Sequence, residues 1–191
     1  MKRLCGIFGW GQFSSAHYSV TANILFLIMM IHQIQIILND GEVSVDQAGA
    51  SDRTALHRAA GANHVEACKV LIEGFGANVD KKDRSGRTPL HWAAISGHSK
   101  TVEYLIDHGA DVYSLNKRKA TPLHNCAQEG NEKTADAIIK RTNDKLKLFN
   151  ALDSDDKRAA DLAKESGHKL MRKLLKEAGD PNVKGSGCII S

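Results

Sequence analysis

A four-residue motif recurs three times in the middle of the chain at an almost constant spacing. Thr54-Ala55-Leu56-His57 is followed by Thr88-Pro89-Leu90-His91 and by Thr121-Pro122-Leu123-His124, at intervals of 34 and 33 residues. Self-similarity at such a period indicates a repeat architecture in which each unit is one small supersecondary structure. This spacing constrains the fold more than any other feature of the sequence.

The residues inside one unit predict two helices. Thr88 is expected to cap the first helix, and Pro89 is tolerated at its first position because the missing N–H would be unpaired there. Ala93-Ala94 permits close helix packing, Gly97 ends the first helix, and the aliphatic pair Leu105-Ile106 belongs to the second. Neither helix can bury its apolar face alone, so neighbouring units must stack.

The repeated pattern resembles the ankyrin repeat family over residues 51–181. The resemblance implies an all-α fold, a helical solenoid of helix-turn-helix units with β-hairpin-like fingers. A divergent fourth unit begins near Arg158, where lysines surround Leu170, Leu174 and Leu175 as a polar end cap requires. The longer interval before Arg158 predicts a lengthened turn at residues 141–145.

One turn position departs from the family pattern. Gly86 fits the turn glycine of the family, whereas Asp52, Lys119 and Asp156 stand at the matching positions of the other units. Aspartate tolerates a positive φ angle better than lysine does. The finger at residues 117–119 is therefore either relaxed or shaped for a partner.

The chain divides into four parts. They are an apolar N-terminal segment, a degenerate repeat remnant, the repeat domain and a flexible tail, at residues 1–35, 36–50, 51–181 and 182–191. Residues 20–38 lack charged side chains and are long enough to span a bilayer. A transmembrane segment, a helix capping the stack, a targeting peptide and an erroneous gene model all remain open interpretations.

The last four residues, Cys188-Ile189-Ile190-Ser191, resemble a prenylation box and predict a farnesyl group on Cys188. The four cysteines are far apart and no Asn-x-Ser/Thr acceptor occurs, which favours a reducing compartment. These features predict a cytoplasmic protein associated with the cytosolic face of a membrane. They conflict with a transmembrane segment at residues 20–38, which would place the repeats across the membrane from Lys2 and Arg3.

The sequence does not predict an enzyme, a metal site or a cofactor. Six of the nine histidines are explained by their repeat positions, namely His57, His64, His91, His98, His124 and His168. Common phosphate-loop, nucleophile-elbow and zinc-protease motifs are missing from the sequence. The net charge of +4 comes from interspersed signs, which argues against nucleic-acid binding.

The resemblance implies that protein partners bind to the finger tips and to the concave face of the first helices. The residues at these positions are Arg53, Arg58, Arg84, Ser85, Arg87, Trp92, Ile95, Lys117, Arg118, Asn125 and Gln128. Trp92 is the candidate hot spot, and the basic residues suggest an acidic partner surface. We therefore expect a protein-interaction scaffold or adaptor tethered by prenylation. The alternatives are a single-pass membrane protein displaying the repeats and a soluble inhibitor of an enzyme or transcription factor.

Overall fold

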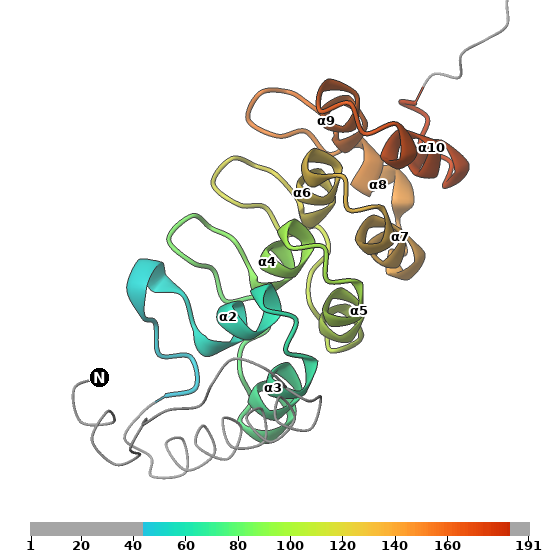
Figure 1. The fold of residues 1–191 in the computed structure, drawn as a ribbon. Coiled ribbons are helices and arrows are strands. Elements are labelled where there is room, and N and C mark those ends of the chain that lie inside the picture. The colour runs from blue at the N-terminus through green and yellow to red at the C-terminus, as the bar shows by residue number, and fades with distance from the viewer. Residues whose placement is uncertain (1–43, 184–191) are drawn as a thin grey trace, which may run out of the picture.

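The computed structural model describes residues 44–183, which form a row of stacked helix pairs (Figure 1). The first helices of the four units lie side by side in one row, and they are α2 (Ala55–Gly61), α4 (Pro89–Ile95), α6 (Pro122–Glu129) and α9 (Ala159–Glu165). The second helices form the other row, and they are α3 (Val65–Lys69), α5 (Ser99–Asp107), α7 (Glu132–Arg141) and α10 (Lys169–Glu177). The predicted all-α solenoid is confirmed, and residues 44–183 contain no strand.

Three shorter elements complete the described chain. They are the 3-10 turn η1 (Ala50–Asp52), the π-helical turn η2 (Val70–Gly74) that continues α3, and the helix α8 (Lys145–Asn150) after α7. We predicted only a lengthened turn at residues 141–145, and that prediction was incomplete. Asp144 caps α8 by accepting the N–H of Lys147, and α8 buries Leu148 and Phe149 completely against the stack.

The core consists of small and aliphatic side chains that recur in each unit. In unit two, Leu90, Ala93, Ala94, Val102 and Leu105 are fully buried. Along the first row α2 packs on α4, α4 on α6 and α6 on α9, and along the second row α5 packs on α7 and α7 on α10. Stability therefore depends on the contacts between adjacent units.

The end cap buries a different set of apolar residues from the one that the sequence predicted. The structure buries Met171 and Leu175 completely, one helical turn apart on α10, and leaves Leu170 68% exposed. Leu174 is half-buried. Leu170 lies outside the stripe of α10 that contacts α7 and α9, so its assignment to the apolar face was wrong.

Histidines join each unit to the next. In unit two, the N–H of Thr88 donates to Nδ1 of His91 (3.2 Å), and Nε2 of His91 lies 3.0 Å from the carbonyl oxygen of Ala120 in the following finger. His57 and His124 make the same contacts in their own units. The third helical position thus ties the start of each first helix to the next finger.

The fingers are tight turns that project to one side of the stack (Figure 1). Lys119 has a φ of 55° and Gly86 a φ of 74°, so the lysine finger keeps the glycine turn and is not relaxed. Backbone hydrogen bonds also join successive fingers: Lys117 N–H donates to the carbonyl of Ser85 (3.0 Å), and Ser154 N–H to that of Arg118 (2.8 Å). The fingers form one continuous, hydrogen-bonded edge.

Several sequence predictions concern residues outside the described range. These are the segment at residues 1–35, the hypothetical membrane span at residues 20–38, most of the remnant at residues 36–50, and Cys188 in the tail. Within residues 44–183, no helix is long and apolar enough to cross a membrane.

Candidate functional site: the finger groove

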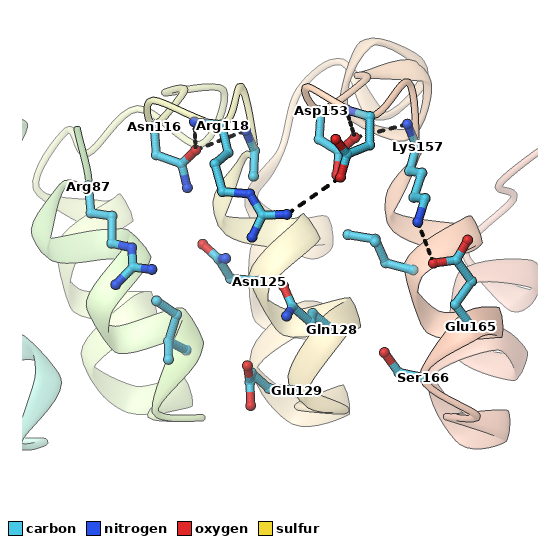
Figure 2. A pocket seen from close by; sticks show the side chains of 14 residues that line it. Arg87, Asn116, Arg118, Asn125, Gln128, Glu129, Asp153, Lys157, Glu165 and Ser166 are labelled. Atoms are coloured by element: carbon cyan, nitrogen blue, oxygen red, sulfur yellow. Dashed lines mark hydrogen bonds and ion pairs between the residues drawn. The ribbon is translucent and has the colours of Figure 1, made fainter. Parts of the chain in front are cut away.

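A groove of about 330 Å³ runs across units two to four between the fingers and the first helices (Figure 2). Helix α6 forms its centre, with α4 on one side and α9 on the other. Five of the residues predicted to bind a partner line this finger groove, and they are Arg87, Ile95, Arg118, Asn125 and Gln128. The structure therefore brings together side chains that are up to 41 positions apart in the sequence.

The finger turns above the groove are fixed by acidic or amide side chains that sequence analysis missed. Oδ1 of Asn116 accepts the N–H groups of Arg118 (2.8 Å) and Ala120 (3.1 Å). Asp83 and Asp153 make the same pair of bonds in the adjacent fingers. An Asp or Asn three residues before the turn position recurs in the three fingers, and this signal could have identified them.

The groove carries charges of both signs, so its lining is not uniformly basic. Nη2 of Arg118 lies 3.5 Å from Oδ2 of Asp155, and Nζ of Lys157 donates to Glu165 (2.7 Å), a bond that raises the pKa of Lys157. Two of the three cations are therefore already paired, Arg118 with the next finger and Lys157 with α9. Arg87 has no ion pair within residues 44–183.

Trp92 does not line the groove. Its ring is half-buried, and the guanidinium groups of Arg53 (4.7 Å to the ring centroid) and Arg87 (5.5 Å) lie over it. Its Nε1 donates to Oδ2 of Asp83 (3.1 Å). The indole also lies against Gly61 of unit one. Trp92 thus joins two units and supports Arg87, which is the side chain that reaches the groove.

The remaining predicted residues lie outside the groove. Arg84 is 70% exposed and faces Asp52 at 3.5 Å across the first two fingers. Ser85 and Lys117 are exposed finger residues, and Arg58 is exposed on α2. The residues predicted to bind a partner therefore fall into two groups, one that lines the groove and one that lies outside it.

His57, His91 and His124 and the cysteines Cys68 and Cys126 are buried in the core. Burial lowers the pKa of His57, His91 and His124, and for His91 the value falls to about 4. Burial raises the pKa of the Cys68 thiol to about 12 and also raises that of Cys126. Between residues 44 and 183, no group of three His, Cys, Asp or Glu side chains is arranged to hold a metal ion.

A comparison with protein families agrees with the repeat pattern. The family model described as "Ankyrin repeats (3 copies)" matches residues 26–116. No curated protein matches the sequence. The fold is an ankyrin-repeat solenoid, and ankyrin repeats indicate a protein–protein interaction module. Units three and four follow the matched region; unit three repeats its histidine contact and unit four its finger contacts.

Proposed function

We propose that this chain is an interaction scaffold or adaptor that binds a protein partner in the finger groove and is tethered to a membrane face by a prenyl group on Cys188. The observation that carries the first part is the groove itself. It combines exposed polar side chains from two fingers with the half-buried aliphatic residues Ile95 and Leu162. A mainly polar lining with a few apolar side chains resembles the polar, hydrated rim of protein interfaces.

The fixed geometry of the fingers supports binding at this surface. The Asx-type bonds of Asn116 and Asp153 and the hydrogen bonds between fingers hold the groove wall in place before a partner arrives. A preorganised surface loses less conformational entropy on binding than a flexible one does.

Site-specific photo-crosslinking of the full chain tests this proposal. A photoreactive residue at Gln128, exposed on α6 inside the groove, is expected to crosslink a protein partner in cells. The matched control is Lys133, which is exposed on the neighbouring helix α7 and does not line the groove. Crosslinking at Lys133 but not at Gln128 would place the partner on the other row of helices and overturn the proposal.

The tether rests on the sequence of the tail alone. Cys188-Ile189-Ile190-Ser191 has the composition of a prenylation box and follows the Gly/Ser-containing residues 184–187. The Cys188→Ser variant is expected to move from the membrane pellet to the soluble fraction. A variant that stays in the pellet at high salt would instead favour anchoring by residues 20–38.

A further inference from the structure

Asn125 lies at the centre of the groove floor with an unsatisfied side-chain amide. It is only 8% exposed, and its Oδ1 is shielded from solvent and has no hydrogen-bond partner. No hydrogen bond from Nδ2 to the described residues is present either, and Figure 2 shows the amide standing free among its neighbours. A buried amide without partners is costly unless a ligand completes its bonds.

The equivalent positions of the neighbouring units do not share this feature. Trp92 occupies the same place in unit two, but its N–H is satisfied by Asp83. Leu162 occupies it in unit four and has no polar group. No hydrogen bond joins Asn116 to Asn125, and Oδ1 of Asn116 accepts two N–H groups of its own finger. The unpartnered amide is therefore specific to the unit at the middle of the groove.

Two charges near Asn125 also lack partners among the described residues. Arg87 lines the groove from unit two, its guanidinium stacks on Trp92, and its Nε is buried without an acceptor. Glu129 lies one helical turn after Asn125 on α6, so both line the same face of that helix. No ion pair of Glu129 occurs within residues 44–183.

We infer, building on the proposed function, that the groove binds an extended segment of the partner whose main chain pairs with the Asn125 amide. The carboxylate of an acidic residue in that segment meets Arg87, and the cation of a basic residue meets Glu129. An asparagine amide can donate to a peptide carbonyl and accept from a peptide N–H, and rotation of its terminal torsion presents either atom. The mainly polar lining distinguishes this site from the apolar pockets that hold small molecules.

The test uses the immobilised full chain and a displayed library of random ten-residue peptides. Enriched peptides are expected to carry an acidic and a basic residue within a few positions of each other. A synthetic peptide of the enriched sequence is then titrated against the wild type, Asn125→Leu and Lys133→Glu. Asn125→Leu is expected to weaken binding at least tenfold, whereas the control Lys133→Glu, exposed on α7 outside the groove, keeps binding within twofold.

Leucine has nearly the shape of asparagine and removes the unpartnered amide, so Asn125→Leu is expected to melt at or above the wild-type temperature. This separates loss of binding from loss of folding. Charge exchange supplies a second readout: Arg87→Glu should lose the peptide at least tenfold and regain binding when the acidic residue of the peptide is changed to lysine. Glu129→Lys should behave in the same way toward a peptide whose basic residue is changed to glutamate.

A library without binders, enriched peptides without the charge pair, or unchanged binding by Asn125→Leu would each overturn this inference. Failure of the inference is distinguishable from failure of the proposed function. Crosslinking at Gln128 together with peptide binding that ignores Asn125 would leave the groove as the partner site and remove only the assignment of its ligand.

Discussion

The Nε2 atom of His91 lies 3.0 Å from the carbonyl oxygen of Ala120, and this contact fixes the tautomer of the imidazole. A carbonyl oxygen only accepts, so Nε2 carries the hydrogen and Nδ1 is free to accept the N–H of Thr88. Protonation would place a second hydrogen on Nδ1, directly facing that N–H. The bond from the Thr88 N–H therefore requires a neutral histidine, whereas Nε2 can donate to Ala120 in either charge state.

The stack should lose stability in mild acid. Burial lowers the pKa of His91 from 6.5 to about 4 in the folded protein. Between these values the unfolded chain binds more protons than the folded chain, so the free energy of unfolding falls as the pH decreases. His91 alone should cost about 2 kcal/mol between pH 7 and pH 5, and His57 and His124 act in the same direction.

Urea titrations at pH 7 and pH 5 measure this loss. The His91→Gln variant should start less stable at pH 7 but show a smaller change with pH. His64→Gln, which alters an exposed histidine of unit one, serves as the control and should keep the wild-type pH dependence. Equal pH dependence in wild type and His91→Gln would contradict the assignment.

Lys119→Gly should stabilise the protein. Lys119 adopts a φ of 55°, a conformation that is strained for a side chain with a Cβ atom and unstrained for glycine. The relief of strain is partly offset by the larger conformational entropy of glycine in the unfolded chain. The free energy of unfolding should therefore rise by about 0.5–1 kcal/mol. Denaturant titration measures it, and Lys119→Ala, which keeps the Cβ atom, should show no gain.

Leu90 on α4 and Leu170 on α10 should respond differently to truncation, although the sequence pattern assigned both to the apolar face of a helix. Leu90 is completely buried, so Leu90→Ala should cost about 2–5 kcal/mol of unfolding free energy. Leu170 is 68% exposed, so Leu170→Ala should cost less than about 0.5 kcal/mol. A large loss for Leu170→Ala in a urea titration would mean that α10 packs in another register.

Trp92→Phe should weaken the link between α4 and the finger of its own unit while keeping an aromatic ring beside Arg87. The substitution removes the N–H that donates to Oδ2 of Asp83, a carboxylate that is only 7% exposed. A hydrogen bond to a charged acceptor of this kind contributes about 1.5–3 kcal/mol. A double-mutant cycle with Asp83→Asn should give a coupling free energy that accounts for much of this loss. Additive changes in unfolding free energy would argue against the bond.

The repeat spacing predicted the helical units, the buried Leu90 and the recurring histidines, because stacking forces equivalent residues into equivalent environments. It did not predict which side of the apolar stripe of α10 is buried, because Leu170, Met171, Leu174 and Leu175 are all apolar. Which of Leu170 and Met171 is buried depends on the faces that α7 and α9 present. Helix α8 was missed because a six-residue segment is too short to display a helical period.

The candidate site was predicted only in part for a different reason. The pattern identified finger and first-helix positions, but it could not separate a side chain that lines the groove, such as Arg87, from one on the rim, such as Arg84. It also could not show that the N–H of Trp92 donates to Asp83, whereas Oδ1 of Asn125 has no hydrogen-bond partner. These distinctions depend on contacts between units, and a single repeat does not contain them.

One wall of the groove is built by the last unit of the stack, which contributes Lys157, Leu162 and Glu165. End units of repeat proteins open more readily than central ones, because they have one neighbour instead of two. Each excursion in which α9 and α10 detach would dismantle that wall while Arg87 and Asn125 remain in place. Warming the protein well below its global melting temperature would then release a ligand, and a bound ligand would in turn suppress fraying at the far end of the chain.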